Sequence, residues 1–371
     1  MDRKTFDIQP IGRFYGASAT IRRPKEIACF SYDDDHKFHL GDSSLKYYYT
    51  PHLPADLNRG FESFQKLDDS ADEHLDALLE TIMALEQETG SICEADIITW
   101  RGMMTKILTA PFDNMNGYSA RASIYHALMD PSFIEEHNSY KNEQKKIHRN
   151  QRMPPGMASQ ELMAYWGYKF ETLSILNQPW DPTPRQEIEG REELIVNNNA
   201  QYCSVVRTAV GRSKLIIGGE VDAIWDRKPD RKEDPINWVE LKTSAEIRND
   251  RDKLKYERKL LKFWAQSFLL GVPRIIVGFR DQQGIVHRLE ELDTASIPGK
   301  VKKFGRATWD GNICINFTAE FLQWLKSTIQ EEGTWRLVKR ERSSVIEVFK
   351  VEDSGTGDII SSAFSEWRST R

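Results

Sequence analysis

The sequence contains no run of 18 or more apolar residues, which argues against a membrane-spanning helix. Its first residues, MDRKTFDIQPIGRF, lack the apolar core of a secretory signal peptide and favour a protein that is not secreted. Only four cysteines occur in 371 residues, and none belongs to a CxxC pair. This excludes a zinc ribbon and argues against a disulfide framework, so we expect an intracellular protein without a membrane partner.

Several common catalytic signatures are also missing. The chain has no HExxH, GxSxG, Walker A or GxGxxG motif, which leaves a zincin, a hydrolase with a GxSxG nucleophile elbow, and a nucleotide-binding loop without support. The formal net charge is −5, from 51 basic and 56 acidic residues. Any binding of nucleic acid must therefore come from a local basic surface and not from the net charge of the protein.

Hydrophobic spacing in the first half of the chain predicts a mixture of strands and helices. Residues 1–70 are rich in aromatic and turn-forming residues, which predicts short strands and loops. Apolar residues at helical spacing predict a helix from about Leu75 to Gly90. The polar stretch 131–157 is expected to be a surface connection, and a second helix is expected over 159–176.

The region from residue 200 to residue 280 changes to strands around one long helix. Strands are expected at 203–206, 214–225, 237–243 and 274–279, and an amphipathic helix at 255–270. This order predicts an α/β protein with a mixed β-sheet core flanked by helices. No linker divides the chain, so we expect a single domain over 1–371, with 1–20 and 350–371 peripheral.

The sharpest chemical signal is Glu220-Val221-Asp222 followed by Glu240-Leu241-Lys242. Residues i and i+2 of a strand point to the same face, so each pair projects together. If the two strands are neighbours, three carboxylates and one ammonium converge. A solvent-exposed hairpin with alternating charges is the alternative interpretation.

The apolar residues around these acids favour burial, and crowded buried carboxylates repel one another and lose hydration. A hard divalent cation with oxygen ligands relieves both costs. Lys242 could then neutralise a substrate phosphate or orient a water molecule. The arrangement resembles the catalytic core of PD-(D/E)xK nucleases, which makes Glu220, Asp222, Glu240 and Lys242 the candidate catalytic residues.

The helix expected at 255–270 carries Lys259, Lys262 and Gln266 on the side opposite its apolar face. Residues 251–262 contain six basic and two acidic residues, a local charge of +4 that would suit a phosphate-binding surface. An ordinary solvated helix face is the alternative.

Three further features carry weaker signals. Trp100-Arg101-Gly102 places a guanidinium beside a flexible glycine, which suits phosphate, although a lone arginine is usually a surface residue. Glu171 could be a fourth metal ligand, or simply a solvated helical residue. Cys203 is typical of a small core residue.

Five motifs in order resemble the DXO/Rai family of RNA decapping nucleases, over roughly residues 20–325. They are WRG at 100–102, GYKFE at 167–171, GEVD at 219–222, VELKTS at 239–244 and KLLKFWAQSFLLGVPRIIVGFRD at 259–281. The phrases LLETI, ADIIT and the ending AFSEWRSTR look most like the fungal nuclear branch. Members of that branch partner a nuclear XRN-type 5′→3′ exoribonuclease.

The resemblance implies roles for individual residues. Metal ligands would be Glu171, Glu220, Asp222, Glu240 and the backbone carbonyl of Leu241. Substrate contacts would come from Glu73, Trp100, Arg101, Gly102, Cys203, Glu220, Lys242 and Gln266. One departure is that His36 stands where the mammalian member has a substrate-contacting arginine.

The implied activity is hydrolysis of defective RNA 5′ ends in the nucleus, with Mg²⁺ or Mn²⁺ and two ions in the presence of substrate. Implied substrates are 5′-triphosphate RNA, incompletely capped RNA and NAD-capped RNA. Three alternatives stay open: a non-catalytic stabilising subunit of the exoribonuclease, a 5′→3′ exoribonuclease in its own right, and a DNA-directed enzyme, against which WRG and GYKFE argue.

Overall fold

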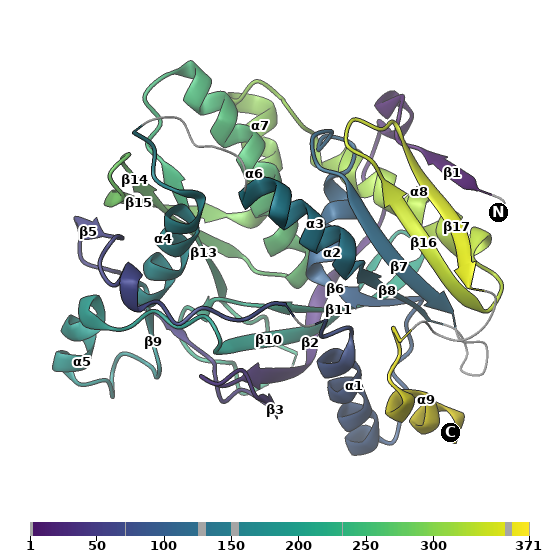
Figure 1. The fold of residues 1–371 in the computed structure, drawn as a ribbon, viewed down its shortest axis with the longest axis horizontal. Coiled ribbons are helices and arrows are strands. Elements are labelled where there is room, and N and C mark those ends of the chain that lie inside the picture. The colour runs from purple at the N-terminus through teal and green to yellow at the C-terminus, as the bar shows by residue number, and fades with distance from the viewer. Residues whose placement is uncertain are drawn as a thin grey trace.

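Two mixed β-sheets form the centre of the protein, and helices pack around them (Figure 1). The computed structural model describes residues 3–70, 72–124, 131–149, 156–231, 233–352 and 358–370. Within these ranges no helix is long and apolar enough to cross a membrane. The α/β class and the helix-flanked mixed sheet expected from the sequence are confirmed, but the strands divide between two sheets instead of one.

The larger sheet has ten strands and is mostly antiparallel. In spatial order they are β1 (Lys4–Asp7), β17 (Val345–Glu352), β16 (Gly333–Lys339), β7 (Tyr118–Ile124), β8 (Ser132–Glu136), β6 (Ile97–Trp100), β11 (Ser213–Glu220), β10 (Gln201–Val210), β2 (Ile21–Tyr32) and β3 (Phe38–Leu40). Only the β8–β6 and β6–β11 pairs are parallel.

The smaller sheet has seven strands. In spatial order they are β5 (Ala55–Asp56), β15 (Ile285–Asp293), β14 (Arg274–Arg280), β13 (Trp238–Ala245), β12 (Ala223–Ile224), β4 (Tyr47–Tyr48) and β9 (Ile175–Leu176). Strands β13 and β14 are parallel and joined by a helical crossover, whereas β12 and β13 are antiparallel.

Helices cover both sheets. They are α1 (Asp76–Thr89), α2 (Arg101–Thr109), α3 (Asn138–Arg149), α4 (Gln160–Leu173), α5 (Arg185–Glu189), α6 (Asp250–Leu270), α7 (Ile297–Phe304), α8 (Gly311–Thr328) and α9 (Ser362–Ser369), with short 3₁₀ turns at Ile11–Phe14, Phe61–Ser63, Gly190–Glu193 and Thr294–Ser296. Gly90 and Gly271 end α1 and α6 in the left-handed conformation, with φ of 67° and 71°.

The predicted helix ends at Gly90 and at residue 270 are therefore confirmed, and α6 begins five residues before the predicted start because Asn249 caps it. The prediction of a surface connection over 131–157 is wrong for residues 131–149, whereas the described residues 156–157 do form an exposed turn. That stretch contains β8, which lies between β7 and β6, and then α3. Its polar composition was misleading because the buried Glu135 is neutralised by Arg121 at 2.7 Å.

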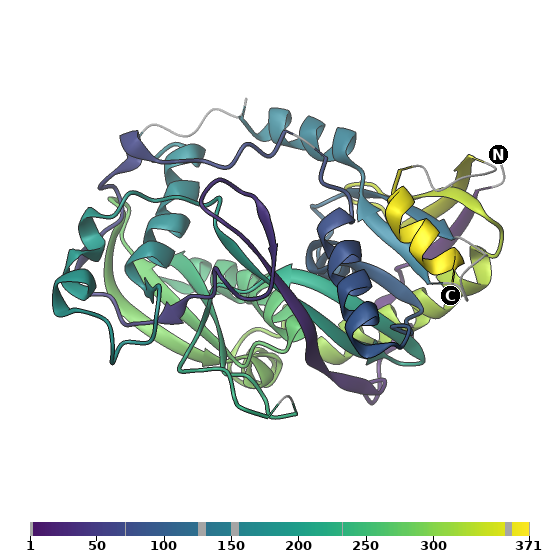
Figure 2. The ribbon, with the colours of Figure 1, turned by 90° about the horizontal axis from the view of Figure 1, so that it is seen from below.

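Both ends of the chain pack against the rest of the fold. Phe6 and Phe14 are buried near the N-terminus, where β1 pairs with β17. Near the C-terminus, Phe364 of α9 is buried, and Arg368 forms an ion pair with Glu86 of the neighbouring α1 at 2.5 Å (Figure 2). The segments that the sequence placed at the periphery thus supply core side chains, while the single-domain assignment stays a prediction.

Candidate active site

The two sheets meet where the chain leaves β11 and enters β12. Glu220 is the last residue of β11, and Asp222 directly precedes β12. The sequence predicted one strand over 214–225, but β11 pairs with β10 and β6 whereas β12 pairs with β13 and β4, so the strand is broken at Val221-Asp222. The expectation that this segment neighbours the ExK strand is confirmed by the antiparallel β12–β13 pair.

Glu240 is the most deeply buried acid at this junction, with no exposed surface. Lys242 Nζ lies 2.5 Å from Glu240 Oε1, and Arg101 Nη1 lies 3.2 Å from Glu240 Oε2. Burial favours the neutral acid, but Lys242 and Arg101 outweigh it and hold the pKa of Glu240 below its ordinary value. Glu240 is therefore a carboxylate clamped between two cations.

The surroundings of the other three acids, Asp222, Glu171 and Glu220, disfavour their ionised forms. Burial, followed by repulsion from Glu240 and Glu220, raises the pKa of Asp222 to about 7. Burial and the charges of Asp222 and Glu220 raise the pKa of Glu171 well above its usual range. The pKa of Glu220 is raised mainly by burial, although Arg101 opposes the shift. The cluster has more buried negative charge than its own cations neutralise.

The backbone of β13 adds an oxygen to this cluster. Asp222 Oδ2 accepts a hydrogen bond from the Leu241 amide at 2.6 Å. The N–H and C=O groups of one strand residue point to the same side, so the Leu241 carbonyl also faces the edge on which Asp222 lies. This orientation agrees with the ligand role that the family resemblance implies for that carbonyl.

The donor types fit a hard divalent cation, since all are carboxylate or carbonyl oxygens. In the described part of the chain, however, no three His, Cys, Asp or Glu side chains are placed to hold a metal ion as they stand. Glu240 Oε2 accepts a hydrogen bond from Arg101, whereas Oε1 lies within ion-pair distance of Lys242 but has no hydrogen-bond partner among the described residues. Coordination by Glu240 would therefore exchange these two ion pairs for the metal.

The structure brings most of the predicted substrate residues to the same junction. Arg101 begins α2 and reaches Glu240, and a Cβ built at Gly102 would meet no atom within 4 Å, so space is open beside it. Cys203 is buried and lies directly opposite Glu220 in the β10–β11 register. Burial raises the pKa of the Cys203 thiol well above its usual value, which keeps it neutral.

The remaining predicted contacts lie around this centre. Trp100 is anchored by a hydrogen bond from its Nε1 to the His74 carbonyl at 2.8 Å. His36 Nε2 is 2.8 Å from the half-exposed Glu73 carboxylate, and its ring stacks on Tyr32 at 4.0 Å. Gln266 is partly buried on α6. The predicted residues thus come from seven separate segments of the chain.

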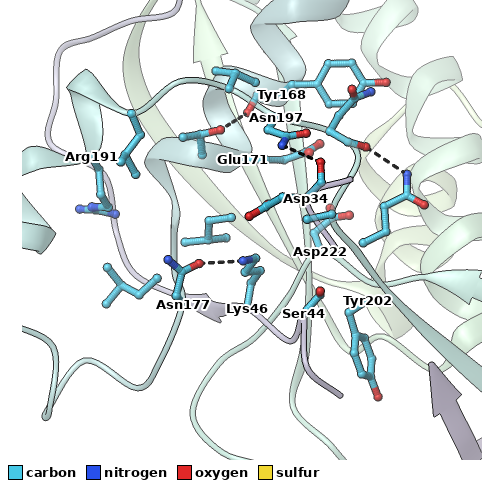
Figure 3. Close-up of a pocket in the computed structure, with 18 of the residues that line it drawn as sticks. Asp34, Ser44, Lys46, Tyr168, Glu171, Asn177, Arg191, Asn197, Tyr202 and Asp222 are labelled. Atoms are coloured by element: carbon cyan, nitrogen blue, oxygen red, sulfur yellow. Dashed lines mark hydrogen bonds between the residues drawn. The ribbon is translucent and has the colours of Figure 1, made fainter. Parts of the chain in front are cut away.

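A cavity opens beside the carboxylates, lined by Glu171, Glu220 and Asp222 (Figure 3). Lys46, just before β4, enters the same cavity and donates a hydrogen bond to Asn177 Oδ1 at 2.7 Å. Sequence reasoning missed Lys46, because a single lysine beside three tyrosines gives no pattern that could single it out.

This combination of a mixed sheet, an ExD pair and a neighbouring strand that carries ExK is that of the PD-(D/E)XK nucleases. A family model described as "RAI1 like PD-(D/E)XK nuclease" matches residues 22–365. The chain therefore belongs to the RAI1-like family of PD-(D/E)XK nucleases, whose named members are decapping nucleases.

Known relatives agree with this assignment. The "Decapping nuclease RAI1" of Aspergillus fumigatus is 77% identical over 369 residues and matches all of both chains. Candida albicans Rai1, solved in complex with pU5-Mn2+, superposes with a TM-score of 0.89 at 28% identity and full coverage of both chains. Scheffersomyces stipitis Rai1, solved with (3'-NADP)+ and calcium ion, has the same TM-score at 27% identity, covering 99% of this chain and 100% of that one.

Proposed function

We propose that the protein is a metal-dependent hydrolase that removes defective 5′ ends from RNA. Its substrates would be 5′-triphosphate RNA, from which it releases pyrophosphate, incompletely capped RNA, from which it releases a cap dinucleotide, and NAD-capped RNA. The single observation that carries the proposal is the buried cluster of Glu171, Glu220, Asp222 and Glu240 with Lys242 beside it.

Divalent ions, Mg²⁺ or Mn²⁺ and two with substrate, would be held by these four carboxylates and the Leu241 carbonyl. When bound, they would supply Lewis-acid stabilisation of phosphate and a water of lowered pKa. The manganese in the C. albicans complex and the calcium in the S. stipitis complex support the expectation of a divalent site.

The residues of this chain would bind and orient the phosphate. If Glu240 were to hold a metal ion, the Lys242 ammonium and the Arg101 guanidinium would lose a carboxylate partner and would be available to a phosphate oxygen. Gln266 would add a neutral donor. The open space beside Gly102 would let the RNA backbone approach the start of α2, while Trp100, Glu73 and Cys203 would line the 5′ end.

The relatives also support the substrate class. The C. albicans protein was solved with the oligonucleotide pU5, and the S. stipitis protein with a 3′-phosphorylated dinucleotide. We infer from the family that the protein acts in the nucleus and partners an XRN-type 5′→3′ exoribonuclease. The intact carboxylate cluster favours catalysis over a role as a subunit that only stabilises the exoribonuclease. Buried acids that bind neither metal nor substrate would lower the stability of the fold.

The proposal is tested by identifying the released product. The purified protein is incubated with Mg²⁺ or Mn²⁺ and 5′-labelled RNAs that carry triphosphate, unmethylated cap, NAD or monophosphate ends. We expect pyrophosphate or an intact dinucleotide from at least one of the first three substrates. Release of mononucleotides from monophosphate RNA alone would support the exoribonuclease alternative, and no product at all would support the stabilising subunit.

Catalysis and partner binding are expected to be separable. The carboxylate cluster is recessed between two sheets, whereas a standard protein interface needs an exposed patch of about 800 Å² on each partner. A Glu220→Gln, Asp222→Asn double variant should therefore still bind the exoribonuclease in a pull-down assay and raise its melting temperature by mass action. Loss of binding in a well-folded variant would mean that the partner docks over the active site.

A further inference from the structure

His36 lies in the turn that joins β2 to β3, and its backbone is left-handed. Its φ is 61°, in a region that few residues other than glycine adopt. Asp33 holds the turn, because its carbonyl accepts a hydrogen bond from the His36 amide at 2.9 Å and its carboxylate accepts one from the Lys37 amide at 2.9 Å. An uncommon backbone conformation that the fold keeps in place is a frequent sign of a functional residue.

Three contacts fix the His36 ring, which is largely buried. The ring stacks on Tyr32 with the two ring centres 4.0 Å apart. Its Nδ1 lies 2.9 Å from the carbonyl oxygen of Asn199, just before β10, and its Nε2 lies 2.8 Å from Glu73 Oε1, just before α1. The ring therefore ties three segments together that are far apart in the sequence.

Both nitrogens of this ring face oxygen atoms that only accept hydrogen bonds. A backbone carbonyl has no proton to donate, and an ionised carboxylate has none either. A neutral imidazole carries one N–H group and could bind only one of the two oxygens, whereas an imidazolium carries two. In this geometry His36 is therefore a cation that donates to Asn199 and to Glu73 at the same time.

Glu73 depends on this cation for its position. Its side chain is 53% exposed, against 15% for His36. In the part of the chain that the structure describes, no other side chain lies within hydrogen-bond or ion-pair distance of the Glu73 carboxylate. A half-exposed glutamate without a partner would move among several rotamers, and ordering it on binding would cost entropy. The fixed ring of His36 thus holds the carboxylate of a predicted substrate residue in one place.

Other titratable groups surround the pair of His36 and Glu73. In the turn itself, Asp33 pairs with His39 at 2.7 Å and Asp35 with Lys37 at 3.3 Å. The groups that act on the pair or on the stacked ring from other elements are Tyr32 of β2, Asp76 and Glu80 of α1, Cys203 of β10 and Glu220 of β11. All of these are acids or neutral groups, so they offer Glu73 no positive charge in place of His36.

We propose that His36 is a positioning residue that holds Glu73 for the RNA 5′ end, and that its charge makes the binding of that end depend on pH. This inference rests on the proposed function. A carboxylate repels phosphate, so Glu73 would accept hydrogen bonds from the sugar or base of the terminal nucleotide. When His36 loses its Nε2 proton as pH rises, its bond to Glu73 is lost, while the Nδ1 bond to Asn199 remains. KM should therefore rise with pH, and kcat should change little.

Two amide side chains separate the roles of the two ring nitrogens. The amide nitrogen of asparagine lies as far from the backbone as Nδ1 of histidine, and that of glutamine lies as far as Nε2. His36→Asn should keep the bond to the Asn199 carbonyl and lose the bond to Glu73, and asparagine tolerates the left-handed backbone. His36→Gln should keep an uncharged donor to Glu73 at every pH. KM for 5′-triphosphate RNA is measured at saturating Mn²⁺ between pH 5 and pH 8, the range in which histidine ordinarily changes charge.

The KM of each variant is divided by that of the wild type at the same pH, so that the contributions of other titrating groups cancel. For His36→Asn we expect a ratio of about ten at pH 5, the effect of one hydrogen bond to a charged group, which falls to about one at pH 8. For His36→Gln the ratio should start near one and fall below one as pH rises. The control is His287→Gln, which changes an exposed histidine that pairs with Asp281 at 2.9 Å on β15; its ratio should stay near one.

Two results would overturn the inference. One is a ratio for His36→Asn that does not change with pH, which would mean that the ring only supports the turn, and the other is equal ratios for the two variants at every pH. If neither variant folds, Glu73→Gln replaces them. Its amide can bind charged or neutral His36, so its KM ratio should fall as pH rises, and a constant ratio would overturn the inference. If the wild type hydrolyses no 5′ end, the proposed function fails, and the same ratios are measured with Kd from fluorescence anisotropy of a 5′-phosphorylated oligonucleotide.

Discussion

Replacing Glu220 by Gln and Asp222 by Asn should abolish hydrolysis of every 5′-end substrate, with a loss of at least about 1,000-fold. The change removes two of the four carboxylates proposed to hold the metal, and electrostatic stabilisation of the reacting group is the largest contribution such sites make. The amides nearly preserve shape, and Asn can still accept the Leu241 N–H bond that Asp222 makes. Turnover is measured with the labelled RNAs, and circular dichroism confirms the fold.

The same double variant should be more stable than the wild type when a chelator removes metal. Burial raises the pKa of Asp222 to about 7, so in the folded protein its ionised form is disfavoured. As pH rises from 4 to 8, the unfolded chain loses this proton before the folded chain does, and the wild type loses stability. The gain in melting temperature should therefore grow from pH 4 to pH 8. Undiminished turnover in the folded variant would contradict the assignment of Glu220 and Asp222 to the active site.

Replacing Lys242 by Gln should lower turnover by about 100-fold or more while leaving Mn²⁺ affinity unchanged or tighter. Lys242 Nζ lies 2.5 Å from Glu240 Oε1 and so competes with a cation for that carboxylate. In the presence of metal the ammonium would be available to a phosphate oxygen, so its removal should lower turnover.

Calorimetric titration with Mn²⁺ and turnover measured at saturating Mn²⁺ separate these two effects. Lys300→Gln, which changes an exposed lysine on α7, serves as the control for the loss of one positive charge. A collapse of Mn²⁺ affinity, combined with normal turnover per bound metal, would show that Lys242 supports the metal and not the phosphate.

The local part of this site could be predicted from the sequence. Residue spacing placed Glu240 and Lys242 on one face of a strand, and the adjacent apolar residues correctly indicated burial. The break at Val221 could not be predicted, because it depends on which strands of two sheets pair on either side of it. Local patterns carry no information about such pairing.

Contacts between residues far apart in the chain could not be predicted from the sequence either. Arg101 appeared only as a possible phosphate ligand, yet in the structure it pairs with Glu240, which is 139 positions away. The burial of β8 was missed because its acidic Glu135 is neutralised by Arg121 on the neighbouring strand. Lys259 looked like one charge among several on α6, and only its position over Thr243 distinguishes it.

The central claim, that these four carboxylates form a divalent-metal site for RNA, is tested most directly by anomalous diffraction. Crystals of the protein grown with Mn²⁺ and a 5′-phosphorylated oligonucleotide would be measured at the manganese absorption edge. We predict anomalous peaks within about 2.2 Å of Asp222 and Glu240 oxygens, with Lys242 turned toward the phosphate. Well-ordered oligonucleotide without an anomalous peak at these carboxylates, or with Glu240 still clamped by Lys242 and Arg101, would contradict the account.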